Sequence, residues 1–279
     1  MSGAAPSGLR QRVPTALVML ALVCLVLFVL PPAATLVLIL IAFLFGAWEW
    51  SAFVAPTRRG IRAAFVALIG LGVLVAWQAT AGRDGLAALL VAAGVWWLVA
   101  LLWITRGPGR AGPVLAAVAG VAALVPTAVA LGRLRGVDPQ GAGVLLFSLA
   151  VIMAADVGAY FAGHRWGRLK LAPRVSPGKT WEGVIGGLVA SLLVAWGGAV
   201  LFGWPPTVIM PLALGAAAFS VVGDLTESLL KRHSGLKDSG HLLPGHGGVL
   251  DRIDSLTAGV PVFTLGLLQA GLIGAEWAP

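Results

Sequence analysis

Uninterrupted apolar segments of about 20 residues recur along this chain of 279 residues and constrain its fold more than any other feature. A helix needs about 20 apolar residues to cross the ~30 Å hydrocarbon core of a membrane. The strands of a membrane β-barrel instead alternate in polarity over about ten residues. The apolar segments lie near residues 13–30, 33–54, 62–80, 86–104, 112–131, 141–162, 183–203, 206–223 and 256–275. The sequence therefore predicts an all-α polytopic membrane protein with about nine transmembrane helices.

The composition fits the same class. Hydrophobic residues make up 59% of the chain and charged residues only 11%, whereas soluble domains carry about a quarter charged residues. No small-residue cleavage site follows the first apolar segment, so we expect a retained span and not a signal peptide. Cys24 is the only cysteine, which excludes an internal disulfide or a cysteine metal cluster.

The distribution of basic residues predicts the orientation in the membrane. Lys and Arg concentrate in cytoplasmic loops. With a cytoplasmic N-terminus, all but three of the 19 Lys and Arg residues lie inside, and only Arg83, Arg133 and Arg135 lie outside. The C-terminus is then expected outside. Basic residues dispersed among spans do not suit nucleic-acid binding, but they favour anionic lipid headgroups at the cytoplasmic face.

Two regions of the chain differ in their polar content. Residues 1–135 hold five expected spans with short loops, and we interpret Trp48 and Trp50 beside Glu49 as interfacial anchors. Residues 136–279 hold four expected spans, the cytoplasmic active-site loops and all four histidines. Asp156 lies within or at the cytoplasmic end of the sixth span, where an ionisable group is costly and faces a cavity or a partner.

One segment, residues 224–255, holds nine of the thirty charged residues of the chain. It reads "DLTESLLKRHSGLKDSGHLLPGHGGVLDRIDS" and begins where the eighth apolar segment ends. In a helix, Asp224, Glu227, Ser228 and Lys231 share one face. A solvated helix face has the same spacing, but charges are scarce in this chain. We therefore favour a site at the membrane surface.

The glycine-rich part of this segment suits phosphate groups. Gly245, Gly247 and Gly248 permit a close backbone approach, and the amides that lead into the following helix could bind an anion. Asp251 and Asp254 share a face of that helix, and carboxylates beside phosphates suit Mg²⁺. The cations available to neutralise phosphate charge are Lys231, Arg232, Lys237 and Arg252. This set fits phosphoryl or nucleotidyl transfer.

Two other motifs invite different interpretations. His233, His241 and His246 suggest zinc, but the segment lacks a helical HExxH arrangement and a cysteine partner. The "SPGKT" motif at residues 176–180 is not a P-loop, because Pro173 occupies the place of its first glycine. Its polar residues either bind a phosphate or form a capped start to the seventh span.

The long spacing pattern resembles the signature of the phosphatidate cytidylyltransferases, also called CDP-diacylglycerol synthases. The matching residues are Ser228, Lys231, Arg232, Lys237, Asp238, Pro244, His246, Gly247, Gly248, Asp251, Arg252 and Asp254. "SPGKTWEG" and "AYFAGHRWGR" are also similar to segments of that family. The first half of the chain is generic and contributes little to the resemblance.

The resemblance implies a specific reaction. The family joins CTP to phosphatidic acid and forms CDP-diacylglycerol and pyrophosphate with Mg²⁺, and a monovalent cation such as K⁺ is a further family expectation. The resemblance implies that Asp224 and Asp251 hold the divalent metal. Catalytic roles are expected for Lys231, Arg232, Lys237, Asp238, Arg252 and Asp254. Substrate contacts are expected from Ser176, Lys179, Thr180, Ser228, Gly245, His246, Gly247 and Gly248.

Two rival functions remain open at this point. A polyprenol or dolichol kinase needs similar phosphate-binding parts, although the long signature separates it from this family. A cation-coupled transporter would use Asp156, Asp224 and Asp251 along an ion path, but the polar residues gather on one face and not around a midplane passage. We expect a bacterial inner-membrane enzyme with a cytoplasmic site, and small residues in the spans leave a homodimer open.

Overall fold

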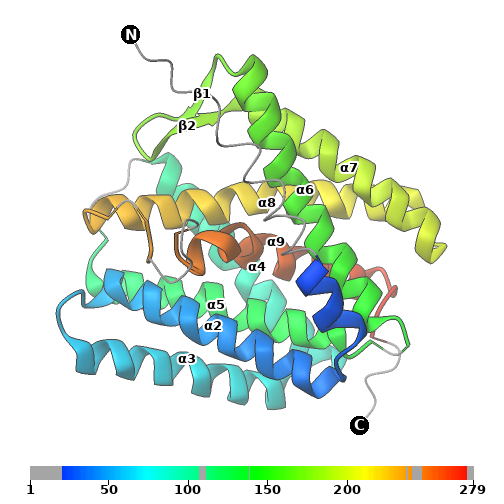
Figure 1. Cartoon of the computed structure of the whole chain (residues 1–279), viewed down its shortest axis with the longest axis horizontal. Coiled ribbons are helices and arrows are strands. Elements are labelled where there is room, and N and C mark those ends of the chain that lie inside the picture. The colour runs from blue at the N-terminus through cyan, green and yellow to red at the C-terminus, as the bar shows by residue number, and fades with distance from the viewer. Residues whose placement is uncertain (1–20, 107–110, 138, 237, 241–246, 275–279) are drawn as a thin grey trace.

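The computed structural model describes residues 21–106, 111–137, 139–236, 238–240 and 247–274. Residues 21–28 are helical and precede the longer elements. The long helices are α2 (Pro32–Val54), α3 (Arg59–Ala79), α4 (Arg83–Thr105), α5 (Pro113–Arg135), α6 (Gly141–Trp166), α7 (Trp181–Phe202), α8 (Pro206–His233) and α9 (Leu250–Gln269) (Figure 1). Two short strands, β1 (Lys170–Ala172) and β2 (Ser176–Thr180), lie between α6 and α7.

Seven of the described helices, α2 to α8, are long and apolar enough to cross a membrane. This finding confirms the helical membrane class and agrees with seven of the expected spans. The expected span at residues 13–30 lies partly outside the described residues. The expected span at 256–275 corresponds to α9, which is not among the seven. Three charged residues in its first two turns make it more polar than a span, and it starts at Leu250.

The segment between α6 and α7 forms an antiparallel hairpin where the sequence indicated only a loop. Lys170 pairs with Thr180 and Ala172 with Ser176. The side chain of Thr180 accepts a hydrogen bond from the amide of Gly183 at 3.1 Å and caps the N-terminus of α7. The capping interpretation of "SPGKT" is therefore correct for Thr180, and the motif forms a strand and not a P-loop.

Helix α9 is buried among helices from both halves of the chain. Pro261 inside α9 has no N–H, so the carbonyl of Thr257 four residues earlier lacks its usual helical partner. Trp97 Nε1 on α4 and Thr127 Oγ1 on α5 donate to this carbonyl at 3.1 and 2.9 Å. Buried backbone groups in a membrane protein need such replacements. These bonds hold α9 to the N-terminal half, and one hydrophobic core runs through both halves.

The three arginines that the orientation prediction places outside have structural partners. Each donates a hydrogen bond to a backbone carbonyl: Arg83 to Leu268, Arg133 to Trp77 and Arg135 to Leu30. The last carbonyls of a helix have no partner within the helix, and a cation near them is favourable. Arg83 and Arg133 therefore serve helix ends, whereas Arg135 bonds to Leu30, two residues after the helix at 21–28.

Small residues allow α6 and α7 to pack closely. A Cβ added at Gly187 on α7 would lie 2.5 Å from the carbonyl oxygen of Ala155 on α6. That contact is with backbone, which cannot rotate away. Gly197, on the same helix, has no atom within 4 Å of an added Cβ.

We therefore predict that Gly187→Val destabilises the protein by about 1–3 kcal/mol through overpacking. Gly197→Val carries the same β-branched cost within a helix but no clash, and should change stability far less. Thermal unfolding of both variants in one detergent checks this. Equal losses of stability would show that α6 and α7 do not approach as closely as described.

Candidate active site

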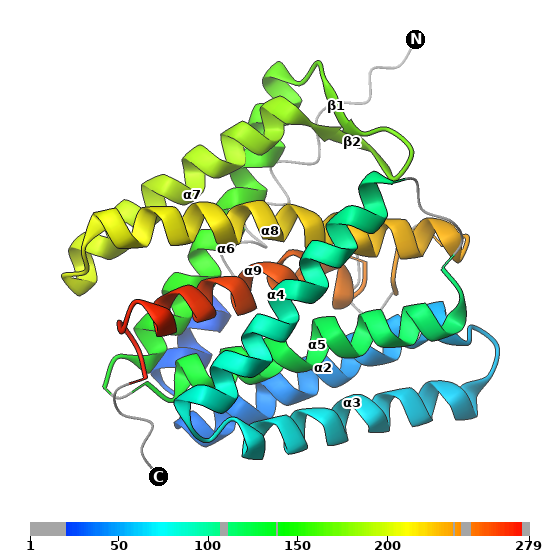
Figure 2. The same cartoon turned by 180° about the vertical axis from the view of Figure 1, so that it is seen from behind.

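Several carboxylates and two lysines of the described chain lie together where several helix ends meet. Figures 1 and 2 show the C-terminal ends of α2 and α8 and the N-terminal end of α9 toward the same side of the molecule, with the β1–β2 hairpin nearby. Helix α8 continues past its apolar part to His233, as the expected charged helix face requires. Its last turns therefore carry carboxylates and a lysine next to the start of α9.

Asp224 on α8 pairs with the hairpin. Its Oδ2 lies 2.5 Å from Lys179 Nζ on β2. Its Oδ1 accepts a hydrogen bond from Ser228 Oγ, one turn later on α8, at 3.2 Å. The structure thus brings together three of the expected site residues from two segments of the chain. The side chains of Lys179 and Asp224 are 24% and 29% exposed, so this pair is open to exchange with a ligand.

A second charged group joins α8 to α9. Lys231 Nζ lies 2.7 Å from Asp251 Oδ1 and 3.3 Å from Glu227 Oε1. The other oxygen of Asp251 accepts hydrogen bonds from the amides of Ser239 and Gly248 at 3.1 and 2.9 Å. Asp251 is therefore fixed by one cation and two backbone donors. Glu227 is only 1% exposed.

Asp254 and Asp156 complete the acidic cluster. Asp254 Oδ1 accepts from the amide of Ser255 at 2.7 Å. The hydroxyl of Ser255 donates to Asp156 Oδ2 on α6 at 2.6 Å. Asp156 thus has a serine hydroxyl as a partner, and its role stays a prediction. Helix α6 thus contributes a carboxylate to the edge of the same cluster.

The electrostatic environments of the two aspartates on α9 differ, and both residues precede the expected span at 256–275. Burial by itself raises the pKa of Asp251, but hydrogen bonds from Lys231, Gly248 and Ser239 outweigh it and hold the pKa below its ordinary value. Burial raises the pKa of Asp254 well above its ordinary value, and the nearby carboxylates of Asp224 and Glu227 reinforce this shift. Asp251 therefore keeps its negative charge to a lower pH than Asp254 does.

The cluster suits a hard cation by its donor chemistry. Within the described residues, no three His, Cys, Asp or Glu side chains converge as a ready-made metal site. Glu227, however, is a buried carboxylate with Lys231 Nζ 3.3 Å from its Oε1, so it adds negative charge and oxygen atoms to the cluster. Mg²⁺ takes oxygen ligands and is often held by one or two carboxylates, with water and substrate phosphates as the other ligands. The oxygens of Asp224, Asp251 and Glu227 fit such an ion.

The other expected site residues are placed less centrally. Arg232, Asp238 and Arg252 are exposed, and Gly247 has a φ of 81° in the left-handed region that favours glycine. Lys237, Gly245 and His246 lie outside the described residues. Of the zinc candidates, His233 Nδ1 accepts from the amide of Ala111 at 3.1 Å. The roles that the sequence assigned to these residues stay predictions.

One buried carboxylate near the cluster, that of Glu49, is not among the site residues expected from the sequence. It is 5% exposed and bonds to the start of α9. The interpretation of its neighbour Trp50 as an interfacial anchor was wrong, because Trp50 is 2% exposed and donates to the carbonyl of Ala116 at 2.8 Å. The signal available in the sequence was a single acidic residue in a long apolar segment.

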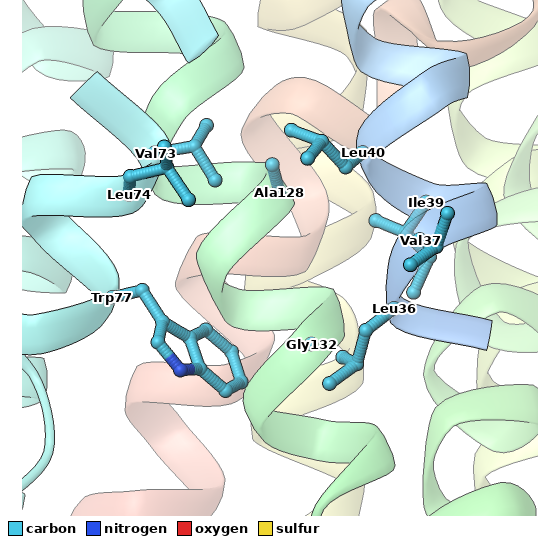
Figure 3. Close-up of a pocket in the computed structure, with 9 residues that line it drawn as sticks. All are labelled: Leu36, Val37, Ile39, Leu40, Val73, Leu74, Trp77, Ala128 and Gly132. Atoms are coloured by element: carbon cyan, nitrogen blue, oxygen red, sulfur yellow. The ribbon is translucent and has the colours of Figure 1, made fainter. Parts of the chain in front are cut away.

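A separate apolar cavity of about 200 Å³ lies between α2, α3 and α5 (Figure 3). Its lining includes Leu36 and Leu40 on α2, Trp77 on α3 and Gly132 on α5. From Leu36 to Glu49, α2 rises about 20 Å at ~1.5 Å per residue. The cavity thus lies toward the other end of the helices and is not part of the charged site.

We predict that Lys231→Met lowers the free energy of unfolding by about 3–5 kcal/mol, because it leaves buried Glu227 and Asp251 without their cation. Arg232→Met changes an exposed cation at the next position and should stay within about 0.5 kcal/mol of the parent protein. Denaturant unfolding of the two variants and the parent protein in the same detergent measures these differences in the free energy of unfolding. Equal stability of the two variants would contradict a structural role for the Lys231 pairs.

Comparison with known proteins identifies the family of this chain. Residues 10–268 match the model of the cytidylyltransferase family. The chain is 39% identical to the phosphatidate cytidylyltransferase of Haemophilus influenzae over 92% of this chain and 97% of that protein. The protein of the same name from Pseudomonas aeruginosa is 41% identical to it over 94% of this chain and 98% of that protein. The Brucella suis protein of that name is 49% identical over 50% of this chain and 52% of that protein. The resemblance inferred from the sequence is confirmed, and this chain belongs to the cytidylyltransferase family of nucleotidyl-transferring enzymes.

Proposed function

We propose that this protein transfers the cytidylyl group of CTP to phosphatidic acid and forms CDP-diacylglycerol and pyrophosphate. The observation that carries this proposal is the cluster of carboxylates and two lysines between β2, α8 and α9. The names of the two relatives that span nearly the whole chain support the choice of substrates. The seven apolar helices support a site from which a lipid substrate can keep its acyl chains in the membrane.

We further propose that the site faces the cytoplasm of a bacterial cell, from the inner membrane. All but three of the 19 Lys and Arg residues lie on one side of the expected topology, and that side is cytoplasmic in membrane proteins. The acidic cluster lies at the end of α8 that carries Lys231 and Arg232. CTP is found in the cytoplasm, which suits this orientation. A homodimer stays a prediction.

The reaction needs little proton transfer. The phosphate of phosphatidic acid is already an anionic nucleophile at neutral pH. One of its oxygens forms a bond to the α-phosphorus of CTP, and the bond from that phosphorus to the β-phosphate oxygen breaks. Pyrophosphate leaves with that electron pair. The main obstacle is repulsion between anions, so positioned positive charge is the chief requirement.

Lys179 and Lys231 are the cations placed to relieve that repulsion. In the structure they neutralise Asp224 and Asp251. Mg²⁺ held by Asp224 and Asp251 would supply charge that stabilises the phosphates and orients the leaving group. The two lysines would then be released to bind phosphate oxygens. The buried carboxylate of Glu227, which is paired with Lys231 in the structure, supports a further place for a monovalent cation such as K⁺.

The backbone at the start of α9 has a different role from the one that the sequence suggested. The amide of Gly248 donates to Asp251, and the amides of Val249 and Leu250 donate to Glu49. These donors are therefore already bonded to protein carboxylates. We propose that lysines bind the substrate phosphates while these amides hold the carboxylates. The substrate-binding role of Gly248 stays a prediction.

The purified protein in detergent is expected to form CDP-diacylglycerol from phosphatidic acid and labelled CTP, and a chelator should abolish this activity. Asp224→Asn and Asp251→Asn should each lower kcat by at least about 100-fold, because they remove charge that organises the phosphates. Product analysis by thin-layer chromatography measures both effects. Folded variants that retain full activity would refute the metal assignment. Turnover of other lipid acceptors alone would point to a different transferase.

Lys179 should compete with the metal for Asp224. We predict that Lys179→Met binds Mn²⁺ about two- to fivefold more tightly in the absence of nucleotide, since partly exposed pairs contribute roughly 0.4–1 kcal/mol. The same variant should show a raised KM for CTP. Lys170→Met, which changes an exposed lysine on β1 of the same hairpin, is the matched control. Weaker Mn²⁺ binding by Lys179→Met would contradict the exchange of partners.

A further inference from the structure

Glu49 connects the N-terminal half of the chain to the site. It lies near the C-terminal end of α2 and is 5% exposed. Its Oε1 accepts from the amide of Val249 at 3.1 Å, and its Oε2 accepts from the amide of Leu250 at 2.7 Å. Oε2 also accepts from Ser239 Oγ at 3.2 Å. A buried carboxylate with donors on both oxygens is a fixed point in the structure.

The backbone around this carboxylate leaves it no freedom to move. A Cβ added at Gly248 would lie 2.5 Å from Glu49 Oε2. A Cβ added at Gly240 would overlap the same carboxylate. Glycine is therefore required on both sides, at the end of the segment 238–240 and just before α9. Both glycines hold their backbone directly against Glu49.

Glu49 acts as a cap for α9 from another helix. The first amides of a helix have no partner within the helix, and a carboxylate near them is favourable. The side chain of the N-cap residue, Val249, forms no capping hydrogen bond. Glu49 supplies this interaction from α2 instead. The cap fixes both the position and the rotation of the first turn of α9.

That first turn carries Asp251, one of the carboxylates of the site. Asp251 accepts from the amides of Ser239 and Gly248, and these are the residues that Glu49 also contacts. Glu49 and Asp251 thus lie against the same two backbone segments, one at Ser239 and one at Gly248. We propose that Glu49 is a positioning residue that sets the metal-binding geometry of Asp251, an inference that rests on the proposed function.

The test uses Glu49→Gln in the full-length protein. This variant keeps the shape but has one acceptor oxygen, and its NH₂ group must face a backbone or hydroxyl donor. The variant is titrated with Mn²⁺ in the absence of substrates, and electron paramagnetic resonance monitors the binding. We expect it to bind Mn²⁺ about 10- to 100-fold more weakly than the wild-type protein does. In turnover assays, the Mg²⁺ concentration for half-maximal rate should rise, and high Mg²⁺ should restore part of the activity.

Two further variants separate positioning from folding. Ser51→Ala removes a buried hydroxyl from the same helix, one that donates to the carbonyl of Trp48 and accepts from Arg62. It should leave Mn²⁺ affinity unchanged even where it lowers the unfolding temperature. Glu49→Asp keeps both acceptor oxygens but is one methylene shorter, and it should bind Mn²⁺ with intermediate affinity. It also provides the measurement if Glu49→Gln does not fold.

The outcomes distinguish this inference from the proposed function. Wild-type Mn²⁺ affinity in folded Glu49→Gln or Glu49→Asp would overturn the positioning role alone. Equal losses of Mn²⁺ affinity and of thermal stability in the Glu49 and Ser51 variants would also overturn it. A wild-type protein that binds Mn²⁺ but forms no CDP-diacylglycerol would overturn the proposed reaction and leave the role of Glu49 standing.

Discussion

The organisation of this protein depends on the compensation of buried negative charge in a chain that is otherwise apolar. Carboxylates at the ends of α8 and α9 need cations or donors, because an isolated charge removed from water is very unfavourable. Lys179 and Lys231 meet this need for Asp224 and Asp251, and backbone amides meet it for Glu49. The same pairs keep lysines beside the site, where phosphates would otherwise repel one another.

Helix α9 is the element through which the two halves of the chain act together. Its start is bonded to Glu49 on α2, and its middle is bonded to Trp97 and Thr127 through the carbonyl that Pro261 leaves free. The N-terminal half carries no residue of the long signature and only two acidic residues, Glu49 and Asp84. Its contribution is to hold α9, and through α9 the carboxylates Asp251 and Asp254, against α8.

Membership of the cytidylyltransferase family indicates the kind of chemistry, and the structure contributes the arrangement of the charged residues. The family match covers both halves, from residue 10 to residue 268, although the long signature lies in the second half alone. The structure offers a physical reason for this extent. Glu49 on α2 and donors on α4 and α5 form hydrogen bonds to α9, so the first half contacts the helix that carries Asp251, Arg252 and Asp254.

The sequence by itself determined the class of fold, most helix positions and the family, because apolar length and motif spacing are local properties of the chain. It also identified Asp224, Ser228, Lys231 and Asp251 as one group, since these residues follow helical spacing or the signature. The tertiary structure alone decided the partners. Pairing of Lys179 with Asp224, burial of Trp50 and capping of α9 by Glu49 join residues far apart in the chain, and no local pattern specifies which distant donor reaches a buried acceptor.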